Sequence, residues 1–436
     1  MPEQDSSIER AKKIRDSLPK DGLFAEKEWR ISPDPFPIDR KTFRQLEKLG
    51  PVLWKFQQAA DTIYRRSRKG TLPDWIAGYL ERGKPDALLE AGLESDVVEA
   101  VPAVIRPDLI LTEDGFAITE LDSVPGGIGL TAWLGETYAG TKPEEKIIGG
   151  ADGMLRGFES IFSSSNVDIA ISEESSDYRP EMEWLAGQLD GDFQVHSAEN
   201  FTAKTDRDIY RFFELFDLPN LPGIEQSFGN PRVTPPFKPW LEEKMWAAIL
   251  RMRPLRDVWR RELRDANFHR LLELFPWSWI VDPAELPHHA VLPKLEIQSF
   301  EELKNFSQTE REMVLKASGF SELAWGSRSV TIGQDVSQDD WASAIDSALE
   351  NFESSPFVLQ EFHRGKVVQH RWFNPDSGEL EIMDARVRLC PYYFAEFGSK
   401  GKKVRLGGIL ATICPSDKKI LHGMRDAILA PCAVMD

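Results

Sequence analysis

The chain has 436 residues, 41% of them hydrophobic and 10% aromatic, which is enough apolar material for a large core in two or three domains. Its 71 acidic and 53 basic side chains leave a net charge of -18, which opposes non-specific attraction to nucleic acids and anionic membranes. Three cysteines without CxxC spacing indicate neither a disulfide framework nor a zinc site, so we expect the chain to act in the reducing cytoplasm.

The N-terminus is charged throughout and lacks the apolar segment of a signal peptide, and no apolar run approaches membrane-spanning length. Residues 1–100 have the pattern of amphipathic helices interrupted by prolines and by Gly50-Pro51, without catalytic spacing. We therefore predict a helical N-terminal region whose function the sequence does not show. We also predict that the chain binds neither a membrane nor a nucleic acid.

A hairpin pattern follows, with two alternating apolar runs on either side of Glu113-Asp114-Gly115. In a three-residue hairpin loop the last residue usually adopts the left-handed conformation, which glycine allows. This choice makes Thr112 the partner of Phe116. Counting outward predicts two charged pairs across the strands, Asp108 with Glu120 and Arg106 with Asp122.

The period of two in a strand places these four charged residues on the face of Ile110 and Ile118. Carboxylates opposed across strands repel each other unless a cation lies between them, so the three acids predict a hard cation such as Mg2+. The alternative is a solvent-exposed face on which Arg106 pairs with Asp122. Glycines in the turn at 124–129 would let the backbone approach a ligand closely, or they form only a sharp turn.

Residues 166–230 alternate strand, helix and strand, which predicts a small α/β layer, and prolines at 219–239 indicate a linker. The next segment is helical and rich in arginine. Its arginines either bind a polyphosphate or an acidic peptide, or they form a solvated face with ion pairs within the helix. The residues of this stripe are Arg253, Arg256, Arg260 and Arg264.

Lys316 ends the short apolar strand 313–315 and precedes a loop with two glycines, hydroxyl groups and an arginine. Such a loop can fold its N–H groups over phosphate oxygens while the lysine adds a point charge. The GxxxxGK[ST] pattern is absent, so this is not a Walker-type site, and a plain connection between strands is the alternative. The loop residues with candidate roles are Ser318, Gly319, Gly326, Ser327 and Arg328.

Ser337 and Asp340 have the spacing that starts a helix, and the apolar run 357–362 predicts a buried strand after it. The turn after this strand could offer backbone groups to an adenine edge and a carboxylate to an amine or a ribose hydroxyl. The alternative is an edge strand that leaves the core. The residues concerned are Gln360, Glu361 and Phe362.

Taken in chain order, these motifs resemble the ATP-grasp enzymes in their circularly permuted form. Arg106-x-Asp108 and Glu120-x-Asp122-x-x-Pro125-Gly126-Gly127 come first, and Lys316 with its loop and Gln360-Glu361-Phe362 come later. In ordinary ATP-grasp chains the carboxylate strand comes last, whereas here it comes first, as in glutathionylspermidine synthetase and eukaryotic glutathione synthetase. The resemblance covers roughly residues 100–436 and includes no cysteine-dependent amidase segment.

The resemblance implies two Mg2+ ions on Asp108, Glu120 and Asp122, and Arg106 at the γ-phosphate or the carboxylate substrate. It implies that Lys316 holds the α- and β-phosphates and that residues 360–362 line the adenine. The sequence departs from the family at Asp122, where asparagine is usual. It departs again upstream of residues 274–276, where a second nucleotide lysine is expected and Arg264 stands instead.

We therefore predict an α/β (α+β) ATP-grasp protein, circularly permuted, with ATP and Mg2+ as cofactors. The predicted activity is a carboxylate–amine ligase that works through an acyl phosphate on a small molecule or peptide. A catalytically silent nucleotide-binding scaffold and an ATP-dependent kinase are the alternatives. The predicted regions are 1–100 helical, 101–140 metal hairpin and glycine turn, 141–235 small α/β domain, and 236–436 nucleotide-binding and C-terminal core.

Overall fold

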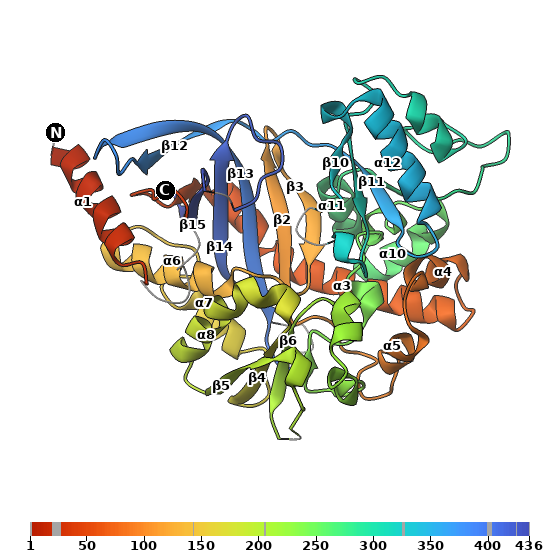
Figure 1. Cartoon of the computed structure of the whole chain (residues 1–436), viewed down its shortest axis with the longest axis horizontal. Coiled ribbons are helices and arrows are strands. Elements are labelled where there is room, and N and C mark those ends of the chain that lie inside the picture. The colour runs from red at the N-terminus through yellow and green to blue at the C-terminus, as the bar shows by residue number, and fades with distance from the viewer. Residues whose placement is uncertain are drawn as a thin grey trace.

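The computed structural model describes residues 2–19, 28–142, 144–204, 206–324, 328–398, 403–423 and 425–435. Within these ranges it contains three β-sheets that lie apart from one another, with helices between and around them (Figure 1). The large sheet has strand order β1-β15-β14-β13-β2-β3, and β12 adds to β13 beside this path. Its strands are β1 (Phe36–Ile38), β2 (Val104–Thr112), β3 (Gly115–Asp122), β12 (Val368–Phe373), β13 (Leu380–Ala395), β14 (Val404–Pro415) and β15 (Ile428–Val434).

Helices cover both faces of the large sheet, and the buried positions of β13, β14 and β15 divide between the two apolar clusters on these faces. On β13, Leu389 belongs to the cluster of α3, whereas Cys390 belongs to the cluster of α6. The first face carries α2 (Arg40–Glu47), α3 (Leu49–Arg68), α9 (Trp246–Ile249), α10 (Arg256–Leu263) and α11 (Asp265–Leu274). The second face carries α1 (Pro2–Asp16), α6 (Ile128–Thr141) and α7 (Gly153–Glu159).

The hairpin of β2 and β3 has the predicted charged pairs but a different turn. Thr112 pairs with Gly115, so the turn has two residues and the predicted three-residue loop is wrong. An irregularity after Asp108 leaves Thr119 unpaired, and this bulge restores the pairs Asp108 with Glu120 and Arg106 with Asp122. The bulge also turns Ile118 to the opposite face, where it pairs with Leu109 and packs near α3, so its predicted place beside the acids is wrong.

The glycine turn after β3 leads directly into α6. Gly127 at its N-cap has a φ of 89°, and a Cβ atom there would lie 2.5 Å from the hydroxyl of Tyr392. Gly126 faces the ring of Tyr178 in the same way, with a Cβ position 2.2 Å from Cε1. These glycines thus allow the main chain to pass between two aromatic side chains.

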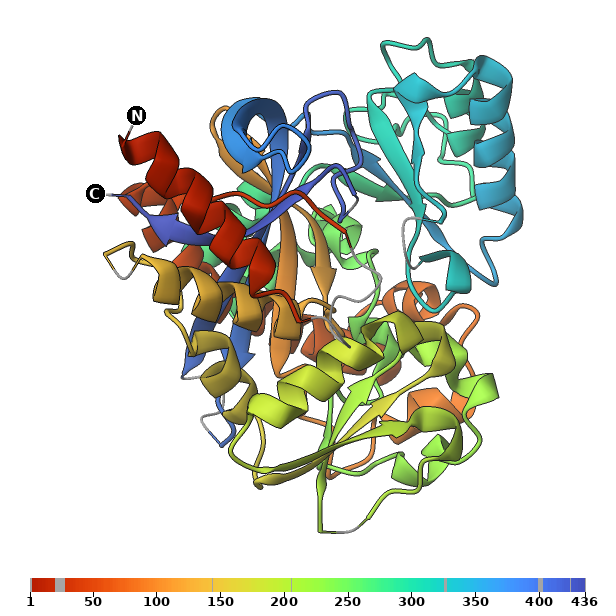
Figure 2. The same cartoon turned by 60° about the vertical axis from the view of Figure 1, so that its left-hand side comes forward.

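The predicted small α/β layer is present as four parallel strands in the order β5-β4-β6-β7. Figure 2 shows this layer below the large sheet. Short 3-10 helices at Glu173–Tyr178 and Leu215–Asn220 lie beside it. The elements are β4 (Asn166–Ile171), α8 (Arg179–Gln188), β5 (Asp192–Ser197), β6 (Asp208–Phe212) and β7 (Val233–Thr234).

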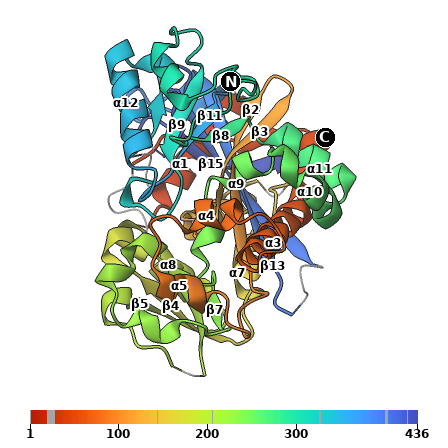
Figure 3. The same cartoon turned by 90° about the vertical axis from the view of Figure 1, so that its right-hand side faces the viewer.

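The third sheet is antiparallel, with the order β10-β9-β11-β8, and α12 packs against it (Figure 3). Ser337 accepts a hydrogen bond from the N–H of Asp340, which confirms the predicted helix start. We call this sheet with α12 the β9 lobe. Its elements are β8 (Ser278–Ile280), β9 (Met313–Ala317), β10 (Thr331–Ile332), α12 (Gln338–Glu350) and β11 (Phe357–Glu361).

The N-terminal region is mostly helical and continues through α4 (Trp75–Glu81) and α5 (Asp86–Ala91). It also supplies β1, which pairs in parallel with β15 at one edge of the large sheet. In the arginine-rich segment, Arg260 pairs with Asp257 and Asp265, so this part of the stripe is a solvated face with local ion pairs. Within the described ranges, no helix combines the length and apolar character needed to cross a membrane.

Candidate functional site

A cavity of about 750 Å³ lies where the large sheet, the small α/β layer and the β9 lobe meet. Its floor is one face of the large sheet, because Arg388 pairs with both Ile110 on β2 and Thr412 on β14, and Thr412 pairs with Leu429 on β15. Residues opposed across strands share a face. The floor consists of Arg106, Asp108, Glu120, Asp122, Arg388, Cys390, Tyr392, Leu410, Thr412 and Leu429.

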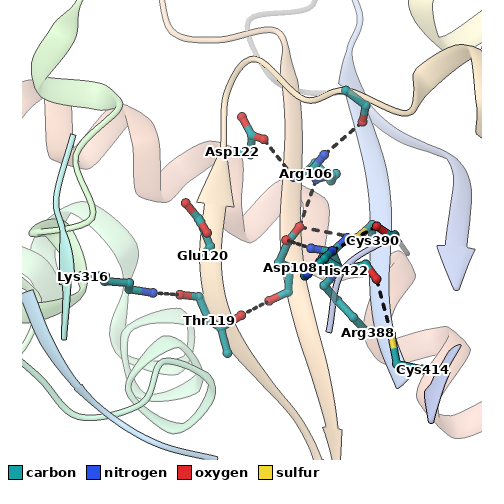
Figure 4. A network of polar contacts seen from close by, with 12 residues as sticks. Arg106, Asp108, Thr119, Glu120, Asp122, Lys316, Arg388, Cys390, Cys414 and His422 are labelled. Atoms are coloured by element: carbon teal, nitrogen blue, oxygen red, sulfur yellow. Dashed lines mark hydrogen bonds and ion pairs between the residues drawn. The ribbon is translucent and has the colours of Figure 1, made fainter. Parts of the chain in front are cut away.

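Arg106 lies between two carboxylates of the hairpin (Figure 4). It donates to Asp108 at 3.0 Å, to Asp122 at 2.9 Å and to the carbonyl of Gly126 at 3.0 Å. The pairing of Arg106 with Asp122, which the sequence left as an alternative, is therefore present. It occurs on the floor of the cavity, so it does not exclude a functional role for either residue.

Asp108 is shared by two arginines. Its second oxygen accepts a hydrogen bond at 3.0 Å from Arg388, a residue 280 positions further along the chain. Burial raises the pKa of Asp108, but Arg106 and Arg388 outweigh burial and hold this pKa below its usual value. The thiol of Cys390 lies 3.5 Å from the same carboxylate, and burial raises its pKa to about 12, so Cys390 is not a thiolate nucleophile at neutral pH.

Lys244 is a cavity residue that the sequence analysis missed. It lies 3.1 Å from Glu120 and donates to the carbonyls of Ser318 and Ala324, at 3.0 Å each. Burial raises the pKa of Glu120, but Lys244 and then Lys316 outweigh burial and lower it. Arg264, the expected substitute for a second lysine, begins α11 on the α3 side of the sheet and does not line this cavity. The structure thus brings Lys244, and not Arg264, to the carboxylates.

Lys316 extends from β9 into the cavity toward the hairpin (Figure 4). It donates to the carbonyl of Thr119 at 2.8 Å and to Oε1 of Gln360 at 3.1 Å. Thr119 is the bulged residue of β3, without a register partner on β2, and β3 is the edge strand of the sheet. Both partners are neutral, and burial lowers the pKa of Lys316 to about 8 although Glu120 partly opposes this shift.

The resemblance to ATP-grasp enzymes implies that Lys316 holds phosphates of Mg-ATP, and we expect such binding to weaken as the pH rises above 8, because Lys316 loses its charge there. The dissociation constant should rise by up to about tenfold per pH unit until the lysine titrates in the complex as well. Titration calorimetry between pH 7 and 9.5 measures this. Lys316→Arg, which stays charged, should flatten the profile, whereas an equally flat profile in the unchanged protein would contradict the assignment.

The predicted residues of the loop after Lys316 lie at the edge of this cavity or outside it. Gly319 lines the cavity, whereas Ser318 is buried behind it and Arg328 pairs with Glu174 of the small α/β layer at 2.9 Å. Gly326 and Ser327 lie outside the described residues. The contacts of Lys244 and Arg328 therefore hold this loop at both of its described ends, against the hairpin side and against the small layer.

The residues predicted to line the adenine do not line the main cavity. Gln360 donates to Ser278 and accepts from Lys316, and it lines a separate cavity of about 30 Å³, which has room for roughly one water molecule. Glu361 pairs with Lys294 at 3.3 Å, at the surface, and the N–H of Phe362 donates to the carbonyl of Glu312. A base at Gln360 would require the aromatic residues around this small cavity to move.

The hairpin carboxylates differ in how well they suit Mg2+. Mg2+ usually binds one or two carboxylates together with waters and substrate phosphates. Glu120 and Asp122 fit this role, because their side chains are 39% and 26% exposed at the cavity wall. Asp108 does not, because both of its oxygens bind arginines. Among the described residues, no group of three or more His, Cys, Asp or Glu side chains is arranged to hold a metal ion.

Carboxyl groups crowd together on the small-layer side of the cavity. Burial, Glu242 and Asp122 raise the pKa of Glu214, and burial raises that of Asp122 although Arg106 opposes the shift. Glu242 is paired with Arg211. Carboxyl groups with raised pKa values are stabilised by an added cation, so this side of the cavity suits a metal ion or an ammonium group.

No family model and no curated protein matches the sequence. Among solved structures, a glutathione synthetase-like effector from Globodera pallida in its apo form matches with a TM-score of 0.55 and 10% identity, over 100% of this chain and 97% of that chain. A candidate gamma-glutamylcysteine synthetase from Methylobacillus flagellatus matches with a TM-score of 0.38 and 12% identity, over 91% and 89%. The chain thus has a glutathione-synthetase-like fold of the ATP-grasp type.

Proposed function

We propose that this chain is a cytoplasmic, ATP- and Mg2+-dependent ligase that joins a carboxylate to an amine through an acyl phosphate. The observation that carries this proposal is the single cavity that contains the hairpin carboxylates, Lys244, Lys316 and Arg388. A triphosphate needs cations on one side and a metal-binding acid on the other. Lys316 and Glu120 supply these, from two sheets that the chain brings together.

The order of the elements supports the circularly permuted form of the fold. The acidic hairpin of β2 and β3 comes before the β9 lobe in the sequence, and the small α/β layer lies between them. Carboxylates in ordinary ATP-grasp chains follow the lysine lobe. The proposed site draws on residues from Arg106 on β2 to Arg388 on β13, so neither sheet would be active alone.

Catalysis in this proposal comes from positioning and charge neutralisation. Lys316, Lys244 and the N–H groups after β9 bind the phosphates, and Glu120 and Asp122 would hold Mg2+, which neutralises the developing charge. An oxygen of the substrate carboxylate attacks the γ-phosphorus and ADP leaves. The amine then attacks the acyl carbon, releases a proton and expels phosphate. Arg106 and Arg388, which Asp108 holds in place, face the acyl phosphate.

A binding protein of the same fold without turnover is the second candidate. Two observations favour it. Each of the three hairpin carboxylates is paired with a cation of the chain itself, and the cavity at Gln360 has too little volume for a purine base. A nucleotide would have to separate Lys244 from Glu120 and open the cavity at Gln360 before it could bind in the proposed position.

The deciding experiment incubates the protein with Mg-ATP and a pool of amino acids, short peptides and polyamines. ADP release together with a product mass equal to the two substrates minus water would support the ligase. Tight Mg-ATP binding by calorimetry without ADP release from any mixture would favour the binding protein. A stable phosphate ester that hydroxylamine does not trap would indicate a kinase instead.

A further inference from the structure

The turn between α4 and α5 joins the N-terminal region to the β9 lobe. The hydroxyl of Tyr79 donates to Asp282 at 2.5 Å, and Arg82 pairs with Glu353 at 3.3 Å. Gly83 has a φ of 70°, and a Cβ atom there would lie 1.9 Å from the carbonyl of Ser354. Only glycine permits this close approach, so the backbone before Lys84 is fixed against the lobe.

Lys84 forms a buried ion pair with Glu243, and neither side chain has more than 1% of its surface exposed. The ammonium group also lies 3.4 Å from the carbonyl of Arg82. A buried charge without its partner is strongly unfavourable, so each member of this pair holds the other in place. The pair therefore links residue 84 to the segment immediately before α9.

The same carboxylate anchors the start of the loop after β9. The hydroxyl of Ser318 donates to the other oxygen of Glu243, and it accepts from the N–H of Met245 at 3.1 Å. Gly319 passes so close that a Cβ atom would lie 3.0 Å from the carboxyl carbon of Glu243. Glu243 is thus the point at which the N-terminal turn and this loop meet.

We propose that Lys84 is a positioning residue for the loop after β9, so that the turn between α4 and α5 belongs to the nucleotide site. The chain of contacts runs from Lys84 to Glu243, from Glu243 to Ser318, and from there to the loop residues that line the cavity. The link to the nucleotide rests on the proposed function. The link to the loop rests on the contacts alone.

The test replaces the buried lysine by an apolar side chain of similar length, Lys84→Met. We expect hydrogen exchange in peptides covering residues 316–324 to accelerate at least about tenfold, and Mg-ATP binding to weaken by a similar factor. The neutral double variant Lys84→Met/Glu243→Gln should recover most of the protection, because the amide oxygen still accepts from Ser318 and no unpaired charge remains.

Arg207→Met is the matched control, because it removes the cation of another buried ion pair, the one with Asp168 in the small α/β layer. It should lower overall stability without changing exchange at residues 316–324. Equal exchange of this loop in Lys84→Met and the unchanged protein would overturn the proposal, and so would the same acceleration in Arg207→Met. If the unchanged protein binds no Mg-ATP, the proposed function fails, but the exchange result still decides the role of Lys84.

If Lys84→Met does not fold, Ser318→Ala tests the same chain of contacts from the other end. It removes the hydroxyl that Glu243 holds and leaves the pair with Lys84 intact. Exchange should then accelerate in residues 316–324 but not in residues 75–91. Unchanged exchange in the loop would overturn the proposal.

Discussion

Glu120→Gln should lower turnover by about 10²- to 10³-fold, because it removes the charge of a proposed metal ligand and leaves the shape of the side chain unchanged. Its effect on folding should be small. The side chain of Glu120 is 39% exposed at the cavity wall, and Lys244 keeps its hydrogen bonds to the carbonyls of Ser318 and Ala324 when this ion pair is lost. Steady-state ADP release measures the turnover, and urea unfolding at pH 7 measures the stability.

Glu113→Gln is the matched control for this substitution. Glu113 lies in the turn of the same hairpin, 75% exposed, and pairs only loosely with Lys366 at 3.6 Å. It makes the same chemical change at the turn of the hairpin, away from the cavity, so turnover should stay unchanged. Turnover of Glu120→Gln within tenfold of the unchanged protein would contradict the role that we assign to this residue.

Asp108→Asn should destabilise the fold by about 3–5 kcal/mol, because it removes the carboxylate that pairs with Arg388 and one of the two that pair with Arg106, in a largely buried setting. The sign also follows from titration. The pKa of Asp108 is lowered in the folded state, so its contribution is present above the unfolded value of 3.8 and is lost as the pH falls through the lower folded pKa. Urea unfolding at pH 7 measures the loss.

Asp122→Asn on the neighbouring strand should behave in the opposite way. The pKa of Asp122 is raised, so its charged form is disfavoured in the folded state, and the amide oxygen can still accept from Arg106. We expect its unfolding free energy to stay the same or to increase slightly. Equal destabilisation by both substitutions would show that the arginines do not depend on Asp108 in particular.

The hairpin shows how much of a strand pairing can be predicted from a sequence pattern. The pairs Asp108 with Glu120 and Arg106 with Asp122 were predicted and are confirmed, but for a reason that the pattern did not contain. A turn shorter by one residue and a bulge at Thr119 shift the register in opposite directions and cancel. Alternation of apolar residues predicts a strand, but it does not distinguish a regular strand from a bulged one.

The composition of the site was predicted only in part. The hairpin, Lys316 and Gly319 line one cavity, which agrees with what the resemblance to ATP-grasp enzymes implied. Lys244 and Arg388 were not assigned to the carboxylates, because their contacts with Glu120 and Asp108 join segments far apart in the chain. Lys244 precedes the apolar residues of α9, and a lone lysine in that position is typical of the polar start of a helix. Only the packing of three sheets shows which charges meet.

The strand at 36–38 has a consequence for handling the chain in fragments. It covers the outer side of β15, which otherwise has β14 as its strand neighbour in the sheet. A fragment that starts at residue 100 would keep the motifs of the proposed site but would leave a long apolar strand with free N–H and C=O groups. An unpaired strand edge can pair with the same edge of another copy, so the fragment should self-associate more strongly than the full chain.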